Sequence, residues 1–139
     1  FDSYYCDFDR NYAFGSISEA AKTAYRVTYE ATEAGFNAAQ VGKTTSDIFN
    51  AMNDVLQKGG ALGNTVGRLG HGLGMQLTEW PSNTQNDNTM LEPGVVLTLE
   101  PGMAFLPGKE MVHEENIVIT ENGPEWLSIR AAEELPIIQ

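Results

Sequence analysis

The stretch VVLTLEPGM, residues 95–103, predicts a strand that is buried on both faces and ends at a carboxylate. From Val95 to Leu99 the run is apolar apart from one threonine, without the alternation of a half-exposed strand. Glu100 follows directly. A glutamate at the end of a buried strand needs a partner, because an isolated charge in the interior is strongly unfavourable. Glu100 is therefore a candidate site residue.

The stretch MVHEENIVIT, residues 111–120, repeats this arrangement. Glu114 and Glu115 stand at the start of an apolar segment that predicts a second interior strand over residues 116–120. Because successive side chains of a strand point to opposite faces, only one of these two glutamates can face inward. The residues alone leave open which one does.

Two further stretches carry polar side chains into segments expected to be interior. In YYCDFDRNYAFG, residues 4–15, an extended strand would place Asp7 and Asp9 on one face, where the two carboxylates repel unless a cation or proton neutralises them. In GRLGHGLGM, residues 67–75, glycines flank His71 and allow its backbone to approach another group closely. An exposed acidic strand and a structural histidine are the ordinary alternatives.

Between these stretches the sequence predicts two amphipathic helices that serve as scaffold. Ser16 and Glu19 resemble a capping box before a helix expected over residues 18–34, which Gly35 would end. Thr44 begins a second helix with the same signal, and a pair of glycines would end it. Helices followed by strands in a chain of this length predict a single domain of the α+β class.

The composition limits the classes of function. The chain has 139 residues and a net charge of -11, which would repel a phosphate backbone and argues against nucleic-acid binding. We expect no membrane insertion, because the sequence shows neither a leader pattern nor an apolar run of transmembrane length. The single Cys6 is compatible with a reducing compartment, so we expect a cytoplasmic location. The opening at Phe1 in mid-strand suggests the C-terminal piece of a longer protein.

Three acid-bearing segments and one glycine-flanked histidine are explained most simply by one metal site. Carboxylates together with imidazole suit manganese, iron, cobalt or zinc rather than metals that prefer thiolates. Two such ions sharing a carboxylate and a water would lower the pKa of that water toward neutral. The residues therefore predict a hydrolytic centre with divalent metal ions, two in number.

Taken in this order, the four stretches resemble the creatinase and Xaa-Pro aminopeptidase superfamily, the pita-bread metallohydrolases that include prolidase and methionine aminopeptidase. YYCDFDRNYAFG is similar to the family's strand with the second aspartate ligand, and GHGLGM to its histidine-ligand segment. LTLEPGMAF and MVHEENIVIT are similar to its two glutamate-ligand strands. The resemblance implies that residues 1–139 are the C-terminal part of a catalytic domain, a curved antiparallel sheet covered by helices, with the N-terminal half and any N-terminal domain absent.

The resemblance also implies roles for individual residues. Asp7 would be shared between two metal ions, and His71 would bind one of them. Glu100 would be a metal ligand and a possible general base. Glu115 would be a bridging metal ligand.

Several positions depart from the family pattern or stay open. Asp9 stands where family members often carry a hydroxyl residue, and the family's first aspartate ligand would lie upstream of Phe1. Thr78 occupies the place of a second histidine in the family pattern HGxGxxxHE, and losing such a donor costs about 100-fold or more in rate. His113, two residues before Glu115, is a candidate catalytic acid, substrate-binding or orienting residue. A structural, solvent-facing His113 is an equal alternative.

Three functions follow from these observations. The first is a metal-dependent hydrolase that cleaves an amide bond, with Xaa-Pro peptides as leading substrates. The second is a non-peptidase member acting on a small zwitterion, like creatinase, ectoine hydrolase or dimethylsulfoniopropionate lyase; Thr78 favours it, and Trp80 with Tyr5 could hold a quaternary cation. The third is a binding module without catalysis, which the intact ligand residues oppose. The resemblance implies a homodimer of the full-length protein.

Overall fold

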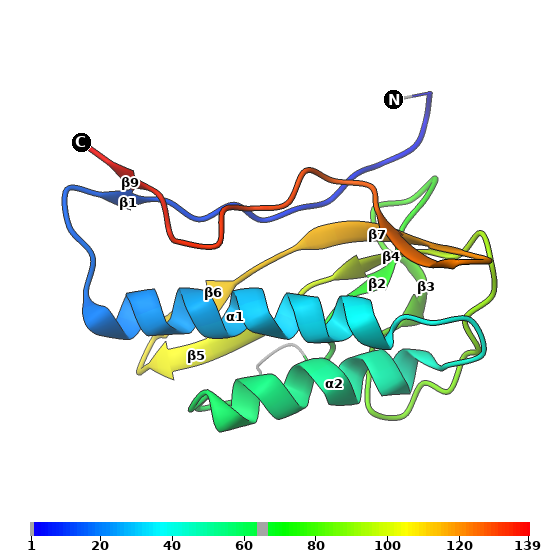
Figure 1. Ribbon diagram of the computed structural model, residues 1–139, viewed down its shortest axis with the longest axis horizontal. Coiled ribbons are helices and arrows are strands. Elements are labelled where there is room, and N and C mark those ends of the chain that lie inside the picture. Colours follow the sequence, from blue (N-terminus) through cyan, green and yellow to red (C-terminus); the bar gives the residue numbers. More distant parts are fainter. Residues whose placement is uncertain (1, 64–66) are drawn as a thin grey trace.

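A five-stranded antiparallel sheet forms the centre of the computed structural model, which describes residues 2–63 and 67–139 (Figure 1). The strand order is β3-β2-β4-β7-β8, and every neighbouring pair is antiparallel. The expected class, a curved antiparallel sheet with helices, is confirmed. The strands of this sheet are β2 (His71–Gly72), β3 (Glu79–Ser82), β4 (Val96–Leu99), β7 (Glu115–Thr120) and β8 (Gly123–Trp126).

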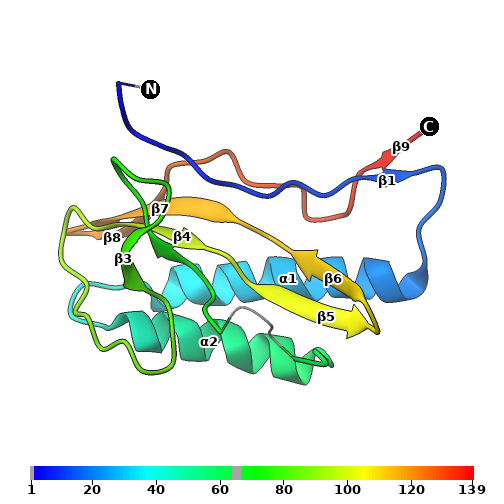
Figure 2. The same ribbon diagram turned by 180° about the vertical axis from the view of Figure 1, so that it is seen from behind.

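A hairpin of β5 (Gly102–Leu106) and β6 (Lys109–Val112) extends this sheet. Figure 2 shows β4 leading into β5 and β6 leading into β7, so that two long curved ribbons run beside each other. Glu100 lies in the break between β4 and β5, and Glu114 lies in the break between β6 and β7. Both candidate acids therefore stand where the ladder is interrupted and side chains can leave the sheet.

The first predicted helix is α1 (Glu19–Ala38), which begins later and ends later than the sequence suggested. Its N-cap is Ser18, whose side chain accepts a hydrogen bond from the N–H of Ala21, so the expected capping box at Ser16 is wrong. Gly35 does not end the helix. A Cβ at that position would lie 2.7 Å from the sulfur of Met52, so this glycine lets the second helix approach closely.

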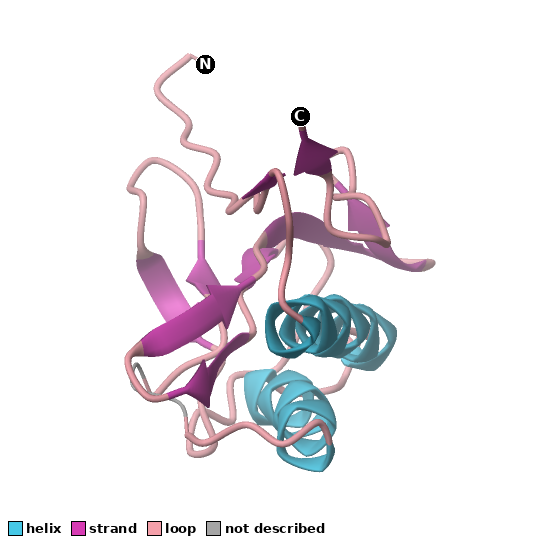
Figure 3. Cartoon of the chain, turned by 90° about the vertical axis from the view of Figure 1, so that its left-hand side faces the viewer, coloured by secondary structure: helices cyan, strands magenta, loops and turns pink. Residues whose placement is uncertain are grey.

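The second predicted helix is α2 (Thr45–Lys58), and its capping box is confirmed. The Thr44 hydroxyl accepts from the N–H of Asp47, and the Asp47 carboxylate accepts from the N–H of Thr44. Gly59 caps the other end. Figure 3 shows α1 and α2 lying together on one side of the strands.

The hydrophobic core lies between this helix pair and the sheet. Buried residues of α1 and α2 form one apolar cluster with buried residues of β4, β5, β6 and β7. Burying these side chains is the main favourable contribution to folding. Its fully buried members include Ala24, Ala31, Ile48, Met52, Leu97, Leu99, Ile117 and Ile119.

The expected strand over residues 4–15 is the main correction to the fold. Only β1 (Ala13–Phe14) is a strand, paired in parallel with β9 (Ile137–Ile138). Figures 1 and 2 show the two terminal segments running beside each other along one edge of the molecule. An extended segment becomes a strand only where a neighbouring backbone completes its hydrogen bonds. Here the side chains of Arg10 and Asn11, rather than a ladder of backbone N–H groups, donate to the carbonyl oxygens of Glu114 and Val112.

Both helices are amphipathic, with buried residues along one face. In the part of the chain that the structure describes, none has the length and apolar character needed to cross a membrane.

Candidate metal centre

Side chains from four separate segments converge around the Nε2 atom of His71. This atom lies 3.9 Å from Oδ2 of Asp7, 3.8 Å from Oε2 of Glu100 and 4.0 Å from Oε1 of Glu114. His71 opens β2, Glu100 follows β4, Glu114 precedes β7, and Asp7 comes from the N-terminal segment. We refer to Asp7, His71, Glu100 and Glu114 as the His71 cluster.

The spacing of the His71 cluster fits a shared cation. Nitrogen and oxygen ligands lie about 2.0–2.2 Å from metals such as zinc, so two ligands of one ion are at most about 4.4 Å apart. The separations of 3.8–4.0 Å from Nε2 lie within that limit. Possible ligand atoms lie within 4.8 Å of one another in each of two groups of three, one of Asp7, His71 and Glu114 and one of Asp9, Glu100 and Glu114. The two groups share Glu114, which is the position a bridging carboxylate would occupy.

The backbone around His71 presents the correct nitrogen to this cluster. Its Nδ1 atom lies 2.9 Å from the carbonyl oxygen of Gly72. Because a carbonyl can only accept, Nδ1 carries a proton, and Nε2 is the nitrogen that faces the three acids. The backbone N–H of His71 donates to the Thr98 hydroxyl at 3.1 Å, which ties β2 to β4.

The glycines beside His71 permit this close packing, as the sequence suggested. A Cβ on Gly70 would lie 2.1 Å from the carbonyl oxygen of Thr98. A Cβ on Gly72 would lie 2.4 Å from the carbonyl oxygen of Trp80. Both neighbours are backbone atoms that cannot rotate away, so β2 can sit between β3 and β4 only with glycine at these positions.

The cluster contains more negative charge than its surroundings balance. Burial raises the pKa of Glu114 to about 8, and the charges of Glu100, Asp7 and Asp9 add to this shift. Burial also raises the pKa of Glu100, against the lowering effect of His71. Oε2 of Glu100 and Oε1 of Glu114 are buried without a hydrogen-bond partner among the described residues. Buried acceptors of this kind are what a cation would satisfy.

The structure does not place Glu115 in this cluster. Its carboxylate is fully buried on the other side of the strand, where it accepts from Arg10 at 2.9 Å, from the N–H of Ala131 at 2.8 Å and from the Ser128 hydroxyl. The reason is the register of the sheet, because Glu115 lies opposite Leu99, which places Glu114 opposite Glu100. Glu114 therefore replaces Glu115 as the candidate ligand.

The structure also separates His113 from the cluster. Its ring is fully buried, with ring centroids 4.8 Å from Tyr25 and 5.7 Å from Tyr29 of α1. Burial lowers the pKa of His113 to about 4, so the ring is neutral near pH 7. A solvent-facing position is therefore wrong, and His113 does not share a face with Glu114.

Three other sequence-based candidates lie at the surface. Thr78 is exposed in the turn before β3, and Trp80 is 75% exposed within that strand. Tyr5 is also exposed, and its N–H donates to the carbonyl of Gly74 at 2.9 Å, beside the same turn. Among the described residues, no ring contact joins Tyr5 to Trp80. The two aromatic side chains are close to this turn but do not form a closed cage.

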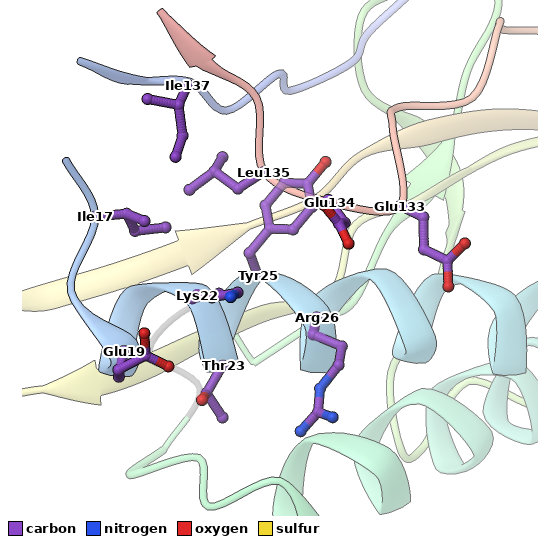
Figure 4. Close-up of a pocket in the computed structure, with 10 residues that line it drawn as sticks. All are labelled: Ile17, Glu19, Lys22, Thr23, Tyr25, Arg26, Glu133, Glu134, Leu135 and Ile137. Atoms are coloured by element: carbon purple, nitrogen blue, oxygen red, sulfur yellow. The ribbon is translucent and has the colours of Figure 1, made fainter. Parts of the chain in front are cut away.

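A separate surface hollow of about 490 Å³ lies between the start of α1 and the C-terminal segment. Figure 4 shows apolar side chains such as Ile17 and Leu135 lining it together with charged ones such as Arg26 and Glu133. No member of the His71 cluster lines this hollow. The hollow is therefore no part of the candidate metal centre.

The chain is similar to known metallopeptidases. The model of metallopeptidase family M24 matches residues 1–121. An Xaa-Pro dipeptidase from Pyrococcus furiosus is 32% identical over 129 residues, which cover 92% of this chain and 37% of that protein. One from Lactobacillus helveticus is 34% identical over 123 residues, 88% of this chain and 33% of that protein. The chain thus spans about a third of the length of these relatives.

A solved structure agrees with this likeness. A dipeptidase from Pyrococcus horikoshii OT3 superposes with a TM-score of 0.91 and 29% identity, over 99% of this chain and 38% of that one. The pita-bread fold expected from the sequence is confirmed by this match. Because the match covers nearly the whole chain, the cluster is built on a scaffold that a solved dipeptidase shares.

Proposed function

Because the chain belongs to metallopeptidase family M24, we propose that the full-length protein is a metal-dependent hydrolase that cleaves an amide bond. Xaa-Pro dipeptides are the leading substrates, since the relatives from Pyrococcus furiosus and Lactobacillus helveticus carry the name Xaa-Pro dipeptidase. Residues 1–139 form the C-terminal part of the catalytic domain in this proposal, which the partial coverage of these relatives supports.

The observation that carries the proposal is the convergence of three acids and one imidazole on a single point. Glu114 is only 3% exposed, and the uncompensated charge around it is unfavourable unless a cation or proton neutralises it. Manganese, iron, cobalt and zinc all suit this ligand set, and we propose that two such ions bind. A divalent ion supplies Lewis acidity that polarises a carbonyl and lowers the pKa of water.

Each residue of the chain has a distinct part in this proposal. His71 offers the lone pair of Nε2 because Nδ1 is engaged with Gly72. Glu114 would be the carboxylate shared by two ions, since it belongs to both groups of ligand atoms, and Asp9 would serve the second group. Glu100 acts as ligand and proton acceptor, because its side chain, at 25% exposed, is the more accessible of the two glutamates.

A non-peptidase reaction on a small zwitterion is the second candidate. Thr78 supports it, because it stands where the peptidases of the family carry a histidine. The exposed rings of Tyr5 and Trp80 beside the same turn could contact a quaternary ammonium group. The binding-module alternative is weaker, because Asp7, His71 and Glu114 keep ligand atoms close enough together to hold a metal ion. A homodimer and a cytoplasmic location remain predictions.

Activity measurements on the full-length protein separate these candidates. Wild-type protein with its bound metal would be assayed against an Xaa-Pro dipeptide, creatine and dimethylsulfoniopropionate, together with Glu100→Ala and the control Glu125→Ala, an exposed glutamate of β8. We expect dipeptide hydrolysis by the wild type and the control, and a loss of about 100-fold or more in Glu100→Ala. Turnover of a zwitterion alone would favour the second candidate, and full activity of Glu100→Ala would contradict the mechanism.

A further inference from the structure

The segment that carries Asp7 and Asp9 has little backbone support of its own. Among the described residues, positions 5–12 take part in one backbone–backbone hydrogen bond, from the N–H of Tyr5 to the carbonyl of Gly74. A segment held this loosely would not keep a carboxylate at a defined distance from His71 without other contacts. The question is therefore which side chains hold Asp7 in place.

Arg10 makes the contacts that the backbone of this segment lacks. Its Nη1 atom donates to the carbonyl oxygens of Asp9 and Glu114, both at 2.9 Å. Its Nη2 atom donates to the Glu115 carboxylate at 2.9 Å and to the carbonyl oxygen of Ile129 at 2.7 Å. One guanidinium thus joins the Asp7 segment, the start of β7 and the segment after β8.

Glu115 is the anchor for this guanidinium. The Glu115 carboxylate is fully buried and is also held by the Ser128 hydroxyl and by the N–H of Ala131. Hydrogen bonds between a planar guanidinium and a carboxylate are short and directional, so an immobile carboxylate also immobilises its arginine. Asn11 adds a further contact, donating to the carbonyl of Val112 at 2.7 Å.

The geometry makes Glu114 and Glu115 complementary. Glu114 directs its carboxylate into the His71 cluster, while its carbonyl oxygen accepts from Arg10. Glu115 directs its carboxylate to the other side of the strand and binds the same arginine. The guanidinium of Arg10 thus links the segment of Asp7 and Asp9 to the strand of Glu114. It does so through the carbonyl oxygens of Asp9 and Glu114 and the carboxylate of Glu115, not through the candidate ligand atoms.

We propose that Arg10, anchored on Glu115, is a positioning residue that holds Asp7 and Asp9 at the distance from Glu114 that metal binding requires. The proposal rests on the proposed metal-binding function of the His71 cluster. Residues that orient metal ligands from outside the ligand set typically change metal affinity by about 10- to 100-fold when they are replaced. A change of that size is expected for loss of Arg10.

The test uses metal affinity rather than activity. Mn²⁺ binding to the metal-free full-length protein would be measured by titration calorimetry, and the melting temperature of each metal-free variant would be recorded. We expect Arg10→Met to raise the Kd by about 10- to 100-fold with the number of bound ions unchanged. Arg10→Lys should lose less affinity, because it keeps the charge opposite Glu115 but cannot make all four contacts.

The matched control is Arg26→Met. Arg26 is an exposed arginine of α1 that faces the exposed Glu30 at 3.9 Å, so its loss removes a charge pair without touching the cluster. We expect its Kd for Mn²⁺ to equal that of the wild type. The double variant Arg10→Met with Glu115→Gln should lose no more affinity than Arg10→Met alone, because Glu115 affects the metal ligands by holding Arg10 in place.

Two results would overturn the proposal. One is a lowered melting temperature in Arg10→Met with an unchanged Kd, which would make Arg10 a purely structural residue; if that variant does not fold, Arg10→Lys decides in the same way. The other is an additive loss in the double variant, which would remove the role of Glu115. Failure of the wild type itself to bind Mn²⁺ is a different outcome, because it would overturn the proposed function together with this inference.

Discussion

Glu114 and Glu115 are adjacent in the sequence, yet their carboxylates lie on opposite sides of one strand. Glu114 faces His71 at 4.0 Å, whereas Glu115 binds Arg10 at 2.9 Å. Both are almost fully buried, so burial alone would not distinguish them. The surroundings do, because Glu114 is among other acids and Glu115 is among donors. A cation belongs beside the first and would be repelled from the second.

Glutamine substitutions at these two positions should therefore have different effects. Glu114→Gln should weaken Mn²⁺ binding by more than about 100-fold, because it removes a ligand rather than a supporting contact. It should not destabilise the metal-free protein, since burial already raises the pKa of Glu114 to about 8 and favours a neutral side chain. Titration calorimetry and denaturant unfolding of metal-free protein measure both quantities.

Glu115→Gln should show the reverse balance. It leaves the guanidinium of Arg10 without its buried counter-charge, which we expect to lower the free energy of unfolding by about 3 kcal/mol. Its loss of Mn²⁺ affinity should be the smaller of the two. Equal effects of the two substitutions on metal binding would contradict the assignment of Glu114.

The neutral, buried His113 makes a pH-dependent contribution to stability. Burial lowers its pKa from 6.5 to about 4, so below about pH 6.5 the unfolded chain binds a proton that the folded chain does not. The contribution of His113 to stability should therefore decrease as the pH falls from about 6.5 to about 4. The free energy of unfolding would be measured for the wild type and for His113→Leu at about pH 7 and about pH 5. We expect it to decrease more between these two pH values in the wild type than in the variant. Identical pH dependence of the two proteins would show that His113 is not buried in the neutral form.

At the scale of the elements, β2 depends on glycine for its place in the sheet. Gly70 has a φ of +133°, and a Cβ there would lie 2.1 Å from the carbonyl oxygen of Thr98. Since Thr98 also accepts the N–H of His71, a displacement at Gly70 would move the imidazole. The strand is short, and its position is set by this contact as well as by its pairing.

We therefore expect Gly70→Ala to lower both stability and Mn²⁺ affinity. The matched control is Gly108→Ala, where φ is +69° and nothing lies within 4 Å of the added Cβ. The control should lose only about 1–2 kcal/mol of stability, from the left-handed backbone, and no metal affinity. Thermal unfolding and Mn²⁺ titration of both variants provide the measurement. If Gly70→Ala behaves like the control, the backbone at Gly70 can move away from Thr98 without loss of stability or Mn²⁺ affinity, which would contradict this prediction.

The elements differ in how far the sequence predicts them. The capping box at Thr44 is a local signal that involves residues three apart, and it holds in the structure. The position where α1 ends is not determined by a local signal. Gly35 lies inside the helix, where it packs against Met52 of α2. Residues 4–12 have strand-like alternation but no paired backbone along most of their length, which no local pattern reveals.

For the molecule as a whole, the sequence predicts which stretches meet at the candidate site, but not which side of a strand each side chain occupies. Asp7, His71 and Glu100 lie together as the sequence analysis expected. The choice between Glu114 and Glu115 depends on the register of β4 against β7, which is set by long-range pairing. No local pattern marks Arg10, because three of its four acceptors lie in segments more than a hundred residues away in the sequence and the fourth is its neighbour.

The central claim is that Asp7, His71, Glu100 and Glu114 bind divalent metal together. The most direct test is anomalous diffraction at the manganese edge from a crystal of the full-length protein grown with Mn²⁺. The account predicts an anomalous peak about 2.0–2.2 Å from Nε2 of His71 and from carboxylate oxygens of the cluster. An ordered cluster without such a peak in saturating Mn²⁺, or a peak bound by Glu115 on the opposite side of the strand, would contradict it.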